Sequence, residues 1–425
     1  MNSLLQSLCH VPGFARAVYE LPAPLPPPQV SESVSTGTAS KSGSTGTRGG
    51  AAESSAVQSA IGSADSGASD AKAEDLAIAH EMQRLLYQLG RAPSLGKVYV
   101  GTQRLTRALG MSPRDVLVQQ DAQEFWQRLY AALAAVGRGH RRKGAPPPAP
   151  TRLGCLFQGT TLNYVRCTRV PFRSERQGRF CDVQLQVAGC RSLGASLQRF
   201  TAEETLDGEY NTKDERYGRQ PAGTARRGCA FRSLPPVLQL HLKRFEYDTA
   251  TGEMRKLDDL FAFPTTLKLR RFMVKGVLAK GDPPPTYELR AVLSHQGGVG
   301  AGHYFSFVRP IGSRGEWYKF DDTRVYRVPE EAAVAHQFGG GTPNTDRGLF
   351  GLASGTPSPC AYMLTYVRQA EVRAAEAAVE SSHAAGAAGG PAVLGGAPAA
   401  EAEALPDELR EAFEAEIAQK RRRRS

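Results

Sequence analysis

A histidine and an aspartate in the second half of the chain have the residue types and spacing of a proton-transfer pair, and a second aspartate follows the first. His303 lies in segment 302–305, and Asp321 and Asp322 close segment 317–322 after a short connection. Both segments alternate in the manner of strands, so a tight turn would bring His303 and Asp321 together. A carboxylate can then orient the imidazole as a general base. A lone histidine on a strand is more often structural, so the pair by itself leaves both interpretations open.

Such a pair needs a nucleophile or a metal ion. His295, eight residues before His303, is the nearest other histidine, and it has no carboxylate companion; the sequence contains no CxxC pair. We therefore expect no metal site and no cofactor. The G-x-S-x-G elbow of serine hydrolases is also absent from the sequence. A cysteine at a helix N-terminus, where the dipole lowers the thiol pKa, is the remaining choice.

Composition narrows the class of protein and its partners. The net charge of +11 comes from scattered arginines and a basic run at 420–424, without interleaved aromatic residues. A nucleic-acid partner is therefore not expected. The seven cysteines are odd in number and widely spaced, which indicates a reducing compartment, and we expect a nuclear and cytoplasmic location. No apolar run has the length of a bilayer span, so no membrane partner is expected.

The first third of the chain predicts helices around an insertion. A short helix is expected over 3–10, followed by a disordered insertion over 22–71 that is rich in Pro, Ser, Thr, Gly and Ala. Further helices are expected from Thr102 to Leu109 and over 116–133. Between the insertion and Thr102, one helical face closed by Gly90 carries Ile78, Met82, Leu85, Leu86 and Leu89.

After a linker at 144–150 the pattern changes to period two. Helices followed by a mainly antiparallel sheet make an α+β fold. From about residue 370 the chain is rich in Ala and Gly, and it ends in an amphipathic helix that starts at Pro406 and carries Leu409, Phe413 and Ile417. The expected strands are 160–166, 180–187, 237–245, 287–295, 304–308, 317–321 and 361–367.

Five segments in the same order resemble the sequence boxes of ubiquitin-specific proteases. The chain opens with Met-Asn-Ser-Leu-Leu-Gln, which is similar to the continuation of the family's cysteine box, G-x-T-C-Y-M-N-S-L-L-Q. The other similar segments are Gln-Gln-Asp-Ala-Gln-Glu-Phe at 119–125, Leu-Pro-Pro-Val-Leu to Lys-Arg-Phe at 234–245, the two segments around His303 and Asp321, and the closing strand at 361–366.

The resemblance implies the thumb, palm and fingers architecture of the papain-like cysteine protease superfamily. A catalytic domain would span 1–369, with a helical thumb at 72–145 and a β-rich palm and fingers at 150–369. Residues 370–425 would be a linker and a basic amphipathic helix. The implied activity is hydrolysis of the bond after the C-terminal glycine of ubiquitin, with ubiquitin and ubiquitinated proteins as partners.

The resemblance also assigns roles to single residues. His303 would be the base, Asp321 its orienting partner and Asp322 an assistant. An extended tail with arginines needs acidic acceptors, which Asp121 and Glu124 would supply. Without the family, a helix-capping and solvated cluster is the alternative for these two residues. The implied ubiquitin-binding set is Asp121, Gln123, Glu124, Phe245, His295 and Tyr304.

The nucleophile is the one part of this machinery that the sequence does not contain. The family's cysteine would lie two residues before Met1, so we expect a chain cut at both ends. Cys9 does not replace it, because it lies about two turns into the helix, roughly 15 Å from where the family thiol would sit. A catalytically inactive ubiquitin-binding module, and a scaffold that works through its basic tail and insertion, stay open as alternatives.

Overall fold

The computed structural model describes residues 1–22, 64–92, 100–112, 121–138, 151–300, 302–340, 358–384 and 401–422. Most of the predicted insertion and the linker at 144–150 lie outside these residues. The predicted end of the insertion at 71 is wrong, because helix α3 (Ala64–Arg91) already begins at Ala64. Gly90 is likewise not a C-cap, since the helix continues through it to Arg91. Helices propagate from a stably packed part at little cost, which explains the longer extent.

The thumb is a group of helices with an aromatic core. It contains α1 (Asn2–Cys9), α2 (Phe14–Tyr19), α3, α4 (Gln103–Ala108), α5 (Ala122–Arg138) and α6 (Arg152–Phe157). Trp126 on α5 is fully buried, and its ring lies 4.9 Å from that of Phe157. α5 begins at Ala122, and residues 113–120 lie outside the described part. The polar segment 121–124 therefore stands at the start of this helix and not in its interior.

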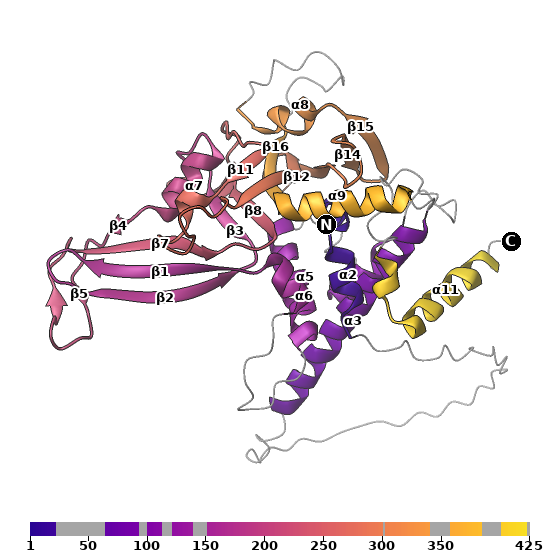
Figure 1. Cartoon of the computed structure of the whole chain (residues 1–425), viewed down its shortest axis with the longest axis horizontal. Coiled ribbons are helices and arrows are strands. Elements are labelled where there is room, and N and C mark those ends of the chain that lie inside the picture. The colour runs from indigo at the N-terminus through magenta and orange to yellow at the C-terminus, as the bar shows by residue number, and fades with distance from the viewer. Residues whose placement is uncertain are drawn as a thin grey trace, which may run out of the picture.

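The palm is an eight-stranded sheet beside the thumb (Figure 1). The sheet is antiparallel except where β3 pairs with β8, and β11 (Thr266–Lys268) is attached to β12. Alternate residues of β16 enter two different cores, Met363 toward the thumb and Leu364 toward the opposite face. The order is β15 (Arg324–Val328), β14 (Trp317–Asp321), β13 (Gly302–Val308), β12 (Thr286–Gly297), β16 (Cys360–Arg368), β8 (Val237–Lys243) and β3 (Val183–Gln186).

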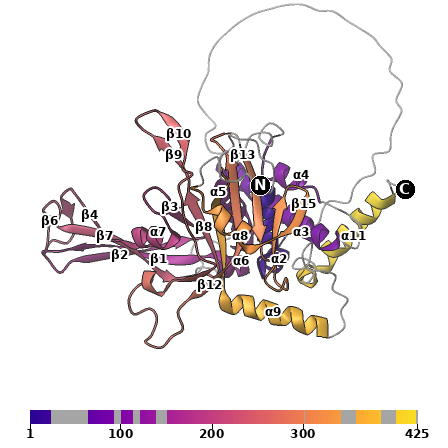
Figure 2. The same cartoon turned by 90° about the horizontal axis from the view of Figure 1, so that it is seen from above.

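The fingers are a separate sheet that extends away from the palm (Figure 1). Its order is β2 (Arg173–Phe180), β1 (Gly159–Cys167), β7 (Ala225–Ser233) and β4 (Glu204–Thr205). The polar edge strand β2 has no hydrophobic alternation, so the sequence did not predict it. At the far end β5 (Tyr210–Asn211) pairs with β6 (Arg219–Gln220). A distinct hairpin of β9 (Phe245–Asp248) and β10 (Glu253–Lys256) projects from the body in Figure 2.

The remaining helices are short, except for two near the C-terminus. α7 (Leu193–Thr201) and α8 (Glu330–Ala333) lie near the sheet in Figure 1, and η2 (Arg270–Phe272), η3 (Ala335–Gln337) and η4 (Ala402–Ala404) are single turns. The expected linker from 370 in fact begins with a helix, α9 (Gln369–Ala384). Ala has the highest helix propensity, so an Ala-rich segment with few glycines forms a helix when one side chain, here Val372, is anchored in the core.

The predicted C-terminal amphipathic helix is α11 (Asp407–Arg422), and it is part of the thumb. Leu409, Phe413 and Ile417 are buried in the same core as Trp126. Glu416 pairs with Arg84 of α3 at 3.4 Å. The predicted domain boundary at 369 therefore separates two segments of the sequence whose side chains pack in one core.

Candidate active site

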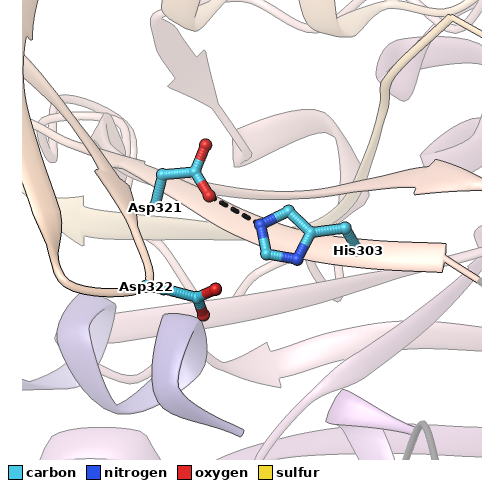
Figure 3. A group of neighbouring side chains, drawn as sticks. All are labelled: His303, Asp321 and Asp322. Atoms are coloured by element: carbon cyan, nitrogen blue, oxygen red, sulfur yellow. Dashed lines mark hydrogen bonds and ion pairs between the residues drawn. The ribbon is translucent and has the colours of Figure 1, made fainter.

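His303 and Asp321 meet as their positions on neighbouring strands predict (Figure 3). Strands β13 and β14 pair through Ser306 opposite Phe320, which brings the end of β14 beside the start of β13. The Nε2 atom of His303 lies 2.6 Å from Oδ1 of Asp321. The imidazole is half exposed, so substrate has access to it. Because Nε2 is bonded to Asp321, Nδ1 is the nitrogen left to exchange a proton with a reacting group.

The second carboxylate oxygen of Asp321 is held by a lysine. Nζ of Lys319 lies 2.9 Å from Oδ2 of Asp321. It also makes a cation–π contact with Phe305, 4.0 Å from the ring centre. Burial works to raise the pKa of Asp321, but the bonds from Lys319 and His303 outweigh burial and lower it. Asp321 thus stays ionised and can stabilise an imidazolium on His303.

Asp322 forms the turn that follows and faces the first helix. Its φ of +51° is a left-handed conformation that Asp tolerates better than most residues. Its backbone oxygen accepts a hydrogen bond from Nε2 of Gln6 at 3.0 Å. His303, Asp321 and Asp322 offer atoms within 4.8 Å of one another, a spacing that would also suit a cation. We interpret these three residues as a proton-transfer site and not as a cation site, since Nε2 of His303 is already hydrogen-bonded to Asp321.

The start of α1 is attached to the same corner of the palm. Oγ of Ser3 donates to the carbonyl oxygen of Tyr304 at 2.8 Å, next to His303 in the chain. The N-terminal end of α1 therefore lies beside the His303 and Asp321 pair.

Asp121 makes contacts within the protein through both of its carboxylate oxygens. Its Oδ1 accepts backbone hydrogen bonds from Gln123 at 2.7 Å and Glu124 at 3.3 Å, which caps α5. Its Oδ2 accepts from the hydroxyl of Tyr362 at 2.6 Å, which joins the thumb to the palm. Both carboxylate oxygens are therefore occupied, as the helix-capping interpretation predicts.

Gln123 and Glu124, which follow Asp121, differ in how much of their side chain is available to a ligand. Nε2 of Gln123 donates to Asp182 at 3.1 Å, in the connection between β2 and β3. Glu124 is exposed, and within the described residues its carboxylate has no ion pair. Asp182 also accepts from Gln127 and Cys181 through its other oxygen, so Glu124 is the acidic group of this corner whose whole carboxylate is available to a cationic peptide.

The predicted channel residues come together in one aromatic cluster. The ring of His295 lies 5.4 Å from that of Phe245 and 4.8 Å from that of Tyr304. Tyr362 completes the cluster, 5.7 Å from Phe245. His295 is only 1% exposed, and neither ring nitrogen has a hydrogen-bond partner. Burial, followed by the charge of Lys256, lowers the pKa of His295 to about 4, so it is neutral at physiological pH.

Sequence reasoning missed three members of this neighbourhood. Tyr362 and His241 lie on the buried strands β16 and β8, with their rings 4.8 Å apart, and a buried strand position gives no functional signal. Lys256 ends the β9–β10 hairpin, where a lysine normally indicates only an exposed surface. Its side chain is in fact 4% exposed.

The buried cysteines do not have the character of nucleophiles. Burial raises the pKa of Cys9 to about 12, so its thiol is protonated within the core of the thumb. Burial also raises the pKa of Cys360 on β16. A reactive cysteine has a lowered pKa and is accessible, and these two thiols have neither property.

Comparison with known proteins gives consistent matches across the chain. The family model described as ubiquitin carboxyl-terminal hydrolase matches residues 1–366. Ubiquitin C-terminal hydrolase 12 of Arabidopsis thaliana is 33% identical over 377 residues, which make up 87% of this chain and 28% of that protein. Ubiquitin carboxyl-terminal hydrolase 7 of Drosophila melanogaster is 33% identical over 291 residues, 68% of this chain and 24% of that protein. The chain thus spans less than a third of these relatives.

Two solved structures have a similar fold. One is the SAGA DUB module with Ubp8 bound to monoubiquitin, with a TM-score of 0.55 and 25% identity over 70% of this chain and 59% of that chain. The other is the same kind of module bound to ubiquitin aldehyde, with a TM-score of 0.59 over 87% of this chain and 67% of that chain. At 22% identity the second match supports the fold alone. Among the described residues, no helix is long and apolar enough to cross a membrane.

Proposed function

Because the chain belongs to the ubiquitin carboxyl-terminal hydrolase family, we propose that it is catalytic machinery of a deubiquitinating cysteine protease. The substrate would be the peptide or isopeptide bond after the C-terminal glycine of ubiquitin. The observation that carries the proposal is the 2.6 Å contact between His303 and Asp321, beside the N-terminal end of α1. A thiol at that end of α1 would face the free nitrogen of His303.

The proposed reaction divides the work between a thiol and the His303 and Asp321 pair. His303 takes the thiol proton on Nδ1, and the thiolate attacks the glycine carbonyl carbon. The imidazolium, stabilised by Asp321, then protonates the departing amine as the C–N bond breaks. Water, deprotonated by His303, hydrolyses the thioester, which releases the ubiquitin carboxylate and restores the thiol.

The proposed binding site for the ubiquitin tail runs between thumb and palm. Glu124 and Asp182 would receive its cationic side chains at the thumb edge. The aromatic cluster of Phe245, His295 and Tyr304 would line the path toward His303. The protein partners would be ubiquitinated proteins, and we keep the nucleus and cytoplasm as the proposed location.

The proposal predicts opposite behaviour for two polypeptides. The 425-residue chain by itself should bind ubiquitin but not cleave a fluorogenic ubiquitin substrate, because its residues do not include the cysteine of the family's cysteine box. A chain extended upstream by the family's Cys-Tyr dipeptide and its preceding loop should cleave it. That loop would also supply oxyanion donors, each of which is typically worth on the order of a hundredfold in rate.

The controls separate this proposal from its alternatives. His303→Ala in the extended chain should remove activity without loss of ubiquitin binding. Turnover by the unextended chain, or labelling of Cys9 by a thiol-reactive ubiquitin probe, would refute the placement of the nucleophile. A silent extended chain that binds ubiquitin would support an inactive binding module, and absence of binding would support the scaffold.

A further inference from the structure

Lys256 is a buried lysine with two partners close to the candidate active site. Its Nζ lies 2.8 Å from Oδ1 of Asp258 and donates to the carbonyl oxygen of Gly297 at 2.8 Å. A lysine is seldom buried unless it is paired, because removing its charge from water is costly. Asp258 supplies the opposite charge, while Gly297 receives a directed hydrogen bond.

Lys256 and Gly297 belong to different elements. Gly297 is the last residue of β12, where it pairs with Gly302, and the next pair along the ladder is Gln296 with His303. Lys256 is the last residue of β10, where it pairs with Phe245. The Lys256 contact therefore attaches the base of the projecting β9–β10 hairpin to the strand pair that carries His303 (Figure 2).

A second contact runs parallel to the lysine contact. Phe245, across the hairpin from Lys256, packs its ring against His295 on β12. His295 in turn fills the space beside Gly302, where an added Cβ would lie only 2.3 Å from its Nε2 atom. A shift of the hairpin base would thus be felt at both Gly297 and Gly302, one residue before His303.

We propose that Lys256 is a positioning residue that couples the β9–β10 hairpin to His303. Ubiquitin held against the foot of the hairpin, where Lys256 pairs with Phe245, then also holds the His303 imidazole in its catalytic position. The inference rests on the proposed function, because it assigns the channel beside Phe245 to the ubiquitin tail. It extends that function by assigning a role to the contact between Lys256 and Gly297, which connects the ubiquitin-binding part of the site with the part that carries His303. Lys256 acts through Gly297 and touches no reacting atom.

The test compares Lys256→Met, Lys256→Arg and Arg255→Met in the full 425-residue chain. Arg255 precedes Lys256 on β10, but it is exposed and pairs with Glu246 on the surface, which makes it a matched control. Two quantities are measured: the Kd for ubiquitin by calorimetry, and hydrogen exchange of the peptide that contains Gly302 and His303.

Lys256→Met should weaken ubiquitin binding about tenfold, the equivalent of one lost hydrogen bond to a charged group. It should also speed exchange around His303 in the free protein about tenfold, while exchange in the thumb and fingers stays unchanged. Lys256→Arg should restore most of both quantities, and Arg255→Met should match the wild type. If Lys256→Met does not fold, Asp258→Asn, which loosens the ammonium without removing it, replaces it.

The outcomes distinguish the inference from the function on which it rests. If the wild type does not bind ubiquitin, the proposed function is wrong. If the wild type binds and Lys256→Met shows unchanged binding and exchange, the coupling is wrong while the function stands. Weaker binding with unchanged exchange at His303 would also refute the coupling, because it would make Lys256 a simple contact residue.

Discussion

At the scale of single residues, two neighbouring carboxylates in one sequence segment do different work. Asp121 caps α5 and accepts the hydroxyl of Tyr362, whereas Glu124 lies exposed one turn further on. The sequence placed both in a ubiquitin-binding set, and only their contacts tell them apart. An Asp at a helix start satisfies backbone amides locally, so part of its acceptor capacity is used within the protein.

Replacement of these two carboxylates should separate stability from binding. Asp121→Ala should lower the free energy of unfolding by about 1–3 kcal/mol, since it removes a helix cap and leaves a buried tyrosine hydroxyl without an acceptor. Glu124→Ala should leave stability unchanged and weaken ubiquitin binding. Urea denaturation and calorimetry measure the two effects. Equal loss of stability in both variants would contradict this division.

At the scale of elements, the fingers hold together as a sheet whose cysteines are far apart. Cys167 pairs with Ala225, while Cys229 on the same strand as Ala225 pairs with Asn163. Four residues of strand separate the two cysteines, about 13 Å at the rise of an extended chain. Two such thiols do not share one tetrahedral ion.

We therefore expect the purified protein to fold without zinc. Elemental analysis should find no stoichiometric metal, and treatment with a chelator should leave the circular dichroism and melting temperature unchanged. Stoichiometric zinc whose removal unfolds the fingers would refute this expectation.

Helix α11 is a second element whose role the structure changes. Phe413 is 1% exposed, and its ring contacts those of His80 and Tyr87 on α3. Phe413→Ala should therefore destabilise the thumb by about 3–5 kcal/mol, as for other large-to-small core substitutions. Glu411→Ala, on the exposed side of the same helix, is the control and should change little. Thermal denaturation decides whether α11 belongs to the domain.

At the scale of the whole molecule, buried neutral histidines connect stability to pH. His295 has a folded-state pKa of about 4 against an ordinary value of 6.5, with burial as the main cause. Burial also lowers the pKa of His241 on the neighbouring buried strand. The unfolded chain binds protons on these residues at a pH where the folded protein does not. The contribution of His295 to stability is therefore complete above pH 6.5 and is lost as the pH falls toward 4, and that of His241 is lost in the same direction.

The free energy of unfolding should accordingly decrease as the pH is lowered from 6.5 to 4. Replacement of His295 by Phe, which keeps a ring in the aromatic cluster, should reduce the slope of this decrease. Chemical denaturation at a series of pH values measures both. An unchanged slope in His295→Phe would show that other groups control the acid sensitivity.

The sequence by itself predicted the contact between His303 and Asp321 and the order of most central elements, although it missed β7 and β15. The spacing of His303 and Asp321 predicted their contact because two adjacent antiparallel strands leave little choice of geometry, and period-two and helical patterns identified the central strands, α1 and α11. Tertiary structure decided the polar edge strand β2, the packing of α11 into the thumb, the hydrogen bond between Asp121 and Tyr362, and the role of Lys256. These depend on contacts between residues distant in the chain, and local periodicity carries no information about such contacts.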